Sequence, residues 1–247
     1  MNKKELFELI IERFLALPGM QDILDEKIEV KARSLTPEEA IGNTERKDYP
    51  ILTGKDVMIE AVYKGVAGQA FTSAPADFSG TLADILKLDY ANDDHAAGLL
   101  VATINAVMGY MGLCDRMIHC KNEGPKLCGV EIGNYIQNTY GDPKALVVGY
   151  QPSIIENLTS RLSQVRALDL DPNNVGQNRC GIVIEHGVTD MKDAMEWADI
   201  ILCTGSTVCN GTLVDYLNVG KKVYFFGTSL AGVAVLLDLP RLCYANL

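Results

Sequence analysis

The sequence has few of the residues that mark nucleic-acid partners or histidine chemistry. Among 247 residues there are three histidines and one tryptophan, and 22 Lys and Arg are outnumbered by 32 Asp and Glu, which gives a formal net charge of −10. An acidic surface repels a phosphate backbone, so we expect no nucleic-acid partner. This charge still permits the binding of a cation or a small zwitterion.

The sequence also lacks a long hydrophobic run. Its most apolar window, residues 99–113, is too short to span a bilayer and contains polar side chains. Glu5, Glu8 and Glu12 interrupt the first apolar residues at every turn, which is unlike a secretory signal. We therefore expect a cytoplasmic protein with no membrane partner. Its seven cysteines are expected to be thiols rather than a disulfide framework.

Several catalytic motifs are absent from the sequence. It has no Gly-x-Ser-x-Gly elbow, no phosphate-binding loop ending in Gly-Lys-Ser/Thr and no His-Glu-x-x-His. The turn at residues 149–152 has one glycine instead of the three of a dinucleotide fingerprint, so a pyrophosphate contact in the manner of NAD enzymes is not supported. What is present is 48% hydrophobic residues, enough for a core, so a disordered chain is excluded.

The chain divides into two predicted domains, residues 1–123 and 124–247, with the boundary placed within 124–142. In the first domain, apolar spacing predicts a helix over 6–17, a strand over 28–32, a hairpin over 57–72, and helices over 81–88 and 94–111. Thr36 followed by Pro37 predicts the start of a short helix. A small antiparallel sheet backed by helices is an α+β domain.

The second half alternates strands with helices. Apolar runs predict strands over residues 145–149, 165–170, 181–185, 199–203 and 222–226. Helices are expected over residues 127–140, 152–164, 192–197 and 212–217. Right-handed crossovers would wind these elements into a parallel sheet covered on both faces, an α/β Rossmann-like three-layer domain.

The segment 201–213 is the most informative part of the chain, because an apolar run ends there in small residues and hydroxyls. In open α/β sheets ligands bind at the carboxyl ends of the strands. Small residues let a ligand approach the backbone, and hydroxyls and amides hold its polar groups. An ordinary capped turn explains the same pattern, and both interpretations stay open. The predicted ligand-binding residues are Thr204, Gly205, Ser206, Thr207 and Asn210.

Four further residues extend this predicted site. Gly149 and Gln151 lie in the first strand-to-helix turn. Asp169 follows the second strand, where an acid accepts hydrogen bonds from ribose hydroxyls, and a solvated turn acid is the alternative. Asn105 lies inside an apolar helix, so its amide either bonds neighbouring backbone or faces a cleft.

A second candidate site gathers soft ligands within ten residues. His119, Cys120 and Cys128 are predicted metal ligands, since thiolate and imidazole suit zinc or a softer transition metal. Alternatively, His119, Cys120 and Glu123 form a catalytic group with the cysteine as nucleophile or the others as acid and base. The spacing is not Cys-x-x-Cys, so one buried cysteine among loop polar residues is the simpler interpretation.

Taken together, these motifs resemble a family of bacterial and archaeal proteins described as heavy-metal-chelation proteins. The similarity involves residues 35–42, 68–72, 104–107, 119–123 with Cys128, and 204–212. The resemblance implies a domain like the N-terminal domain of enolase, then a Rossmann-like domain similar to that of methyltransferases, with the site between them. It implies metal chelation, or condensation or hydrolysis in the synthesis of a pterin-, flavin- or siderophore-like chelator. Enolase's barrel, magnesium ligands and activity are not implied.

Three functions follow in order of preference. The first is a small-molecule binder or enzyme with its ligand in the inter-domain cleft. The second is a heavy-metal-handling protein that uses the Cys/His segment, with a transition metal as its cofactor or cargo. The third is a binder of S-adenosylmethionine or a similar nucleoside through Asp169. A homodimer is expected because two-fold dimers are the commonest soluble oligomers.

Overall fold

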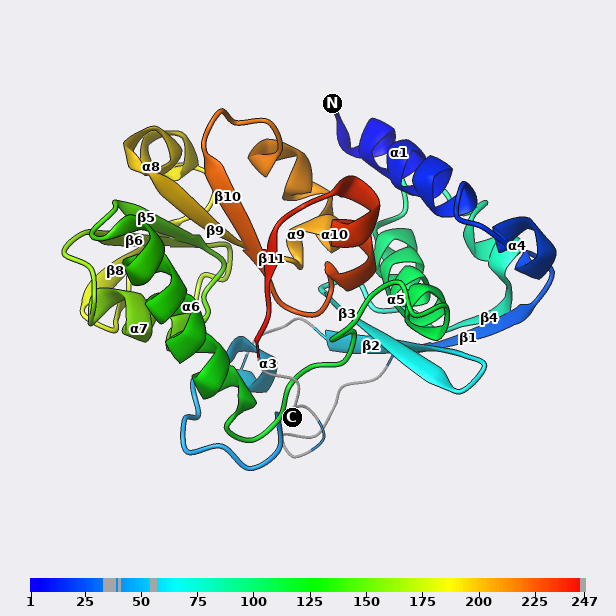
Figure 1. The fold of residues 1–247 in the computed structure, drawn as a ribbon, viewed down its shortest axis with the longest axis horizontal. Coiled ribbons are helices and arrows are strands. Elements are labelled where there is room, and N and C mark those ends of the chain that lie inside the picture. Colours follow the sequence, from blue (N-terminus) through cyan, green and yellow to red (C-terminus); the bar gives the residue numbers. More distant parts are fainter. Residues whose placement is uncertain (33–38, 40, 54–56, 245–247) are drawn as a thin grey trace.

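The computed structural model describes residues 1–32, 39, 41–53 and 57–244 (Figure 1). The short helix predicted at Thr36 and most of the 35–42 motif lie outside the described residues. Two sheets and their helices make a mixed α/β fold. Among the helices that the structure describes, none combines the length and the hydrophobicity that a membrane-spanning segment requires.

The first sheet is antiparallel and has the strand order β3-β2-β1-β4. Its strands are β1 (Lys27–Ala32), β2 (Val57–Tyr63), β3 (Val66–Thr72) and β4 (Phe78–Thr81). β2 and β3 form the predicted hairpin, with Tyr63 opposite Val66 across a two-residue turn. That prediction is confirmed.

Helices cover one face of this sheet. α1 (Lys3–Leu15) begins with a capping box in which Asn2 and Glu5 each accept the other's backbone N–H. η1 (Met20–Ile23), α3 (Pro50–Thr53) and α4 (Leu82–Ile85) are short. α5 (Asp94–Tyr110) is buried on nearly every side, because the sheet covers one face and helices of the second half cover another.

The second sheet has the order β11-β10-β9-β5-β6-β8-β7 and is parallel except for β7. Its strands are β5 (Ala145–Val148), β6 (Val165–Asp169), β7 (Asn178–Arg179), β8 (Ile182–His186), β9 (Ile200–Thr204), β10 (Lys222–Phe226) and β11 (Arg241–Leu242). All five predicted strands are confirmed. The strand order reverses at β5, which lies between β6 and β9, so this is the topological switch point.

Helices pack on both faces of the parallel sheet, and alternate residues of β5 face opposite ways. Ala145 and Val147 join a core with α6 (Gly124–Tyr140) and α7 (Pro152–Thr159). Leu146 and Val148 face the other core. The helices on that second face are α8 (Met191–Trp197), α9 (Thr207–Asn210), the 3-10 helix η2 (Thr212–Tyr216) and α10 (Ala231–Leu237).

The predicted α-helix at 212–217 is corrected by the structure. An α-helical turn already begins at Thr207, and Gly211 in the left-handed region separates it from η2. The helix predicted over 152–164 ends earlier, at Thr159. Both differences arise where glycine or polar residues interrupt the helical hydrogen-bond pattern.

One hydrophobic core runs through both predicted halves. It contains Phe14 and Ile59 of the first half together with Phe225 and Leu236 of the second. α5 lies at the junction, and β3 approaches it so closely that a Cβ on Gly68 would lie 2.2 Å from the backbone nitrogen of Ala106. The two sheets are therefore held together through this helix.

Candidate functional site

The predicted ligand loops meet at the carboxyl edge of the parallel sheet, beside the switch point. The Gly149 N–H donates to the Leu168 carbonyl at 2.8 Å, and the Gly205 N–H donates to the Phe226 carbonyl at 2.7 Å. Gly149 has φ +87°, and a Cβ there would lie 2.6 Å from Thr204 Cγ2. The sequence thus placed the loops after β5, β6 and β9 in one neighbourhood, and the structure brings them into direct contact.

Most of the predicted ligand groups in these loops bond backbone. The carboxylate of Asp169 accepts the N–H groups of Tyr150 at 2.5 Å and Asp171 at 2.6 Å. Gln151 Oε1 caps α7 by accepting the Ser153 N–H at 2.8 Å. Thr207 is buried, and its hydroxyl donates to the Thr204 carbonyl at 2.8 Å. These side chains shape the loops.

Two hydroxyls at this edge, those of Thr204 and Ser206, bond each other. Thr204 Oγ1 and Ser206 Oγ lie 3.1 Å apart and are half-buried. Asn210 lies at the far end of α9, where its Oδ1 accepts from the N–H and hydroxyl of Thr212. The adjoining Gly211 packs on the Lys3 side chain. The amide oxygen of Asn210 is thus used within its own turn.

Asn105 bonds backbone, which is the first of its two predicted alternatives. Its side chain has 0% exposure. Its Nδ2 donates to the carbonyls of Gln69 at 2.9 Å, Ser229 at 3.2 Å and Thr228 at 3.3 Å, and its Oδ1 accepts the Gly232 N–H at 2.7 Å. The amide joins α5, β3 and the segment between β10 and α10, so we leave it outside the site.

Sequence reasoning missed a charged network that lies beside the first of these loops. Arg46 Nε donates to Asp48 at 2.5 Å, and the Tyr150 hydroxyl donates to the same carboxylate at 2.7 Å. Burial alone would raise the pKa of Asp48, but the bonds from Arg46 and Tyr150 outweigh it and lower that pKa. Arg46 also pairs with Glu156 of α7 at 2.7 Å. The one sign of this network in the sequence is that an arginine, Arg46, and an acid, Asp48, lie two residues apart.

The Cys/His segment keeps part of its predicted grouping. Cys120 and Cys128 interact electrostatically, and a third thiol that the sequence did not single out, Cys243, shares a hydrogen bond with Cys128. Glu123 is exposed and pairs with Lys126 at 3.4 Å, and the backbone N–H of His119 donates to Gln69 at 2.8 Å. The structure thus brings together Cys128 of α6 and Cys243 after β11, with Cys120, before α6, within electrostatic range of both.

Two of these thiols, Cys120 and Cys243, are held in the protonated form. Burial, and secondly the neighbouring Cys128, raises the pKa of Cys120 to about 12. The hydrogen bond with Cys128 and burial also raise the pKa of Cys243. All seven cysteines lie in the described part of the chain and none is in a disulfide. The described residues contain no group of three or more His, Cys, Asp or Glu placed to hold a metal ion.

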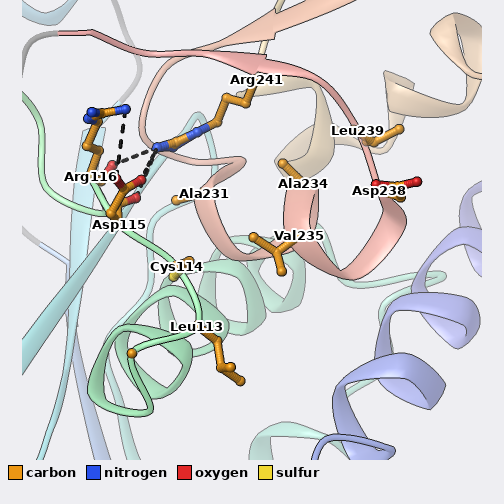
Figure 2. A pocket seen from close by; sticks show the side chains of 11 residues that line it. Leu113, Cys114, Asp115, Arg116, Ala231, Ala234, Val235, Asp238, Leu239 and Arg241 are labelled. Carbon is orange, nitrogen blue, oxygen red and sulfur yellow. Dashed lines mark hydrogen bonds and ion pairs between the residues drawn. The ribbon is translucent and has the colours of Figure 1, made fainter.

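A hollow of about 620 Å³ lies elsewhere, between the segment after α5 and the α10–β11 region (Figure 2). None of the predicted site residues is among the described residues that line it. The lining residues are Gly112, Leu113, Cys114, Asp115, Arg116, Ala231, Ala234, Val235, Asp238, Leu239 and Arg241.

Comparison with known proteins confirms the resemblance that the motifs predict. Residues 135–240 match the model of the DUF364 family, which is described as "Putative heavy-metal chelation". The matched span contains most of the parallel sheet. Cys128 and Cys243 lie just outside it, on either side. The chain has no match among curated proteins.

Two solved structures of DUF364-family proteins of unknown function have a similar fold. The protein from Pyrococcus horikoshii is 16% identical with a TM-score of 0.55, and the match covers 91% of this chain and 79% of that one. The protein from Desulfitobacterium hafniense DCB-2 is 14% identical with a TM-score of 0.58, and the match covers 96% and 84%. At these identities the likeness shows the fold alone.

Proposed function

Because residues 135–240 match a family described by heavy-metal chelation, we propose that this protein binds a soft heavy-metal ion as its cargo through Cys128 and Cys243, with Cys120 beside them. The observation that carries the proposal is that two thiols 115 positions apart (243 − 128) in the chain are neighbours, with Cys128 the first cause of the raised pKa of Cys243. Thiolate sulfur is the protein ligand that soft ions prefer.

The donor set fits some metals and not others. A closed tetrahedral zinc site needs four ligands, and the described residues supply no group of even three in position. Two thiolates suffice for a soft monovalent ion such as Cu(I), which accepts two sulfur ligands in line. His119 and Glu123 are therefore not part of the proposed ligand pair.

Metal uptake at these thiols requires the release of protons. The raised pKa values of Cys120 and Cys243 keep both groups neutral near pH 7, so an incoming ion must displace the protons. The apparent affinity should consequently increase with pH.

An anaerobic titration tests this proposal. Protein purified without chelators is titrated with Cu(I) against a competing chelator, and with Zn and Ni for comparison, in the presence of a phosphine reductant. We expect one equivalent of Cu(I) on the wild type, loss of that binding in Cys128→Ser and Cys243→Ser, and weaker binding in Cys120→Ser. Cys180→Ser is the matched control, since Cys180 is another half-buried thiol and lies beside Arg46. Equal binding by all four variants would contradict the proposal.

A second candidate function is the binding or conversion of a small molecule at the carboxyl edge of the parallel sheet. The half-buried hydroxyls of Thr204 and Ser206 at the switch point support it. Condensation or hydrolysis in the making of a metal chelator would suit such a site. Both carboxylate oxygens of Asp169 accept hydrogen bonds from backbone amides, so we do not propose that Asp169 binds a nucleoside.

This candidate function predicts two variants that lose ligand binding and keep their stability. Ser206→Ala and Thr204→Val should weaken the binding of a co-purified small molecule and leave the melting temperature nearly unchanged. A ligand that binds both variants with wild-type affinity would remove these hydroxyls from the site. We also propose that residues 1–123 form an enolase-like domain and residues 124–247 a Rossmann-like domain. We further propose that the protein is a homodimer, and light scattering measures its oligomeric state.

A further inference from the structure

The hollow beside α10 contains two arginines whose buried N–H groups are not used. Among the residues that the structure describes, Arg241 Nη1 and Arg116 Nε are buried without a hydrogen-bond partner. The Arg241 side chain is only 9% exposed. A buried donor without a partner costs free energy, and a charged donor costs more, so such groups indicate a missing acceptor.

The backbone holds the Arg241 guanidinium in place. Arg241 Nη2 donates to the Asp115 carbonyl at 3.0 Å and to the Arg116 carbonyl at 3.5 Å. Arg116 has φ 53°, a left-handed conformation that costs free energy for a residue with a side chain. The fork of Arg241 is therefore fixed by the same segment that carries Arg116.

A single exposed carboxylate lies between the two arginines. Figure 2 shows dashed lines from both guanidinium groups to Asp115, at 3.8 Å for Arg116 and 3.7 Å for Arg241. Both contacts are longer than a hydrogen bond, and the Asp115 side chain is 70% exposed. Because Asp115 is exposed and neither contact is a hydrogen bond, the arginines hold this carboxylate weakly, and another anion can replace it.

Apolar side chains line part of the hollow. Leu113, Ala231, Val235 and Leu239 line it, and Figure 2 places the other acid, Asp238, at the end away from the arginines. A volume of about 620 Å³ is within the range of sites for small organic ligands. An inorganic ion would leave these apolar side chains uncovered.

We propose that this hollow binds a small organic anion, whose phosphate or carboxylate group lies on Arg116 and Arg241 and whose apolar part covers Leu113 and Val235. Planar guanidinium forks match both kinds of oxyanion. None of the proposed thiol ligands and none of the residues at the carboxyl edge of the parallel sheet line this hollow, so the proposal does not depend on the function proposed above. Arg241 is nevertheless an electrostatic neighbour of Cys243.

Calorimetric or NMR titration of the full chain with phenyl phosphate, benzoate and inorganic phosphate tests this proposal. We expect at least one organic anion to bind about tenfold or more tightly than inorganic phosphate, because only the former covers the apolar wall. The preferred head group distinguishes a phosphate ester from a carboxylate. Absence of binding by both organic probes overturns the proposal.

The test becomes specific when variants expected to weaken anion binding are compared with one expected to strengthen it. Arg116→Ala and Arg241→Ala should weaken binding by about 10- to 100-fold. Asp115→Asn should tighten it several-fold, because it removes the competing charge and keeps the backbone carbonyl that Arg241 uses. Lys192→Ala removes one exposed cation on α8 and should change nothing. Wild-type affinity in Arg116→Ala, or no gain in Asp115→Asn, overturns the assignment even where Arg241→Ala fails to fold.

Discussion

At the scale of single residues, Asn105 connects three segments that are distant along the chain. Its amide bonds the backbone of β3 and of the segment before α10 while its own Cα belongs to α5. An amide with all its capacity used in this way is a structural group. The sequence indicated that the amide needed partners and could not say which, because the partners are up to 127 residues away.

Asn105→Ala should therefore destabilise the protein by about 2–4 kcal/mol, because it leaves buried backbone groups unpaired and opens a cavity. Thr103→Val is the matched control on the same helix. Thr103 is also buried, and its hydroxyl has no hydrogen-bond partner among the described residues, so this change should be near neutral. Urea unfolding of both variants measures the difference, and equal effects would contradict the role of the amide.

Gly149 is a second residue whose role is decided by its surroundings. Gly149→Ala meets both a left-handed backbone and a contact of 2.6 Å with Thr204 Cγ2. Gly181→Ala meets a similar backbone with φ +85° and no described atom within 4 Å. We expect about 1–2 kcal/mol of destabilisation for Gly181→Ala and roughly 1–3 kcal/mol more for Gly149→Ala. Thermal unfolding would disprove the contact if the two variants lost the same stability.

At the scale of elements, the Arg46–Asp48–Tyr150 network ties the segment before α3 to the β5–α7 turn and to α7. The Tyr150 hydroxyl donates to Asp48, and Arg46 donates to Glu156. The hydroxyls of Tyr49 and Ser153 share a hydrogen bond of 2.6 Å. The described residues 42–49 of this segment form no helix or strand. Its place is fixed by these side chains.

The lowered pKa of Asp48 makes this attachment depend on pH. Asp48 stays ionised in the folded state at pH values where the unfolded chain, with a pKa near 3.8, takes up a proton. The stabilisation is therefore present above about pH 4 and is lost as pH falls through the lowered folded pKa. The difference in unfolding free energy between wild type and Asp48→Asn should be largest near pH 6 and should shrink toward pH 2. A difference that is constant with pH would argue against the ion pair.

The elements that could be predicted are those with a strong period. The five long parallel strands are continuous apolar runs, and α5 and α6 have clear helical spacing. β7 and β11 are two residues each, too short for any period to be seen. They exist because a neighbouring strand supplies hydrogen-bond partners, which is tertiary information.

At the scale of the whole molecule, the shared core joins the two predicted domains. Buried residues of α1, α5, β2 and β10 belong to one apolar cluster. A separate pair of cores would have let each half unfold alone. The domain boundary within residues 124–142 stays a prediction from the sequence. In the structure, α6 occupies most of this region.

We therefore expect a single cooperative unfolding transition. Trp197, the sole tryptophan, lies in the second half beside Arg166 and reports on that half by fluorescence, whereas far-ultraviolet circular dichroism reports on both. The two signals should give the same midpoint in urea. Two midpoints would show that the halves unfold independently.

The candidate sites were predictable only in part, and for a spatial reason. The loops at the strand ends are brought together by the parallel topology, so their neighbourhood followed from the strand pattern. Cys243 and the arginine pair join segments that no local spacing connects. Arg116 and Arg241 are 125 positions apart (241 − 116), and only the packing of α10 against α5 brings them together.

The short strands at the borders of the parallel sheet affect how copies of the protein meet. β7 and β11 are the edge strands of the parallel sheet and have two residues each. In the antiparallel sheet β3 is a longer edge strand, and its Gln69 N–H donates to the Met117 carbonyl at 2.9 Å. Open rows of unpaired backbone groups recruit strands from other molecules and nucleate fibrils. In the described part of the chain such rows are brief or covered, which protects crowded protein against growing cross-β aggregates.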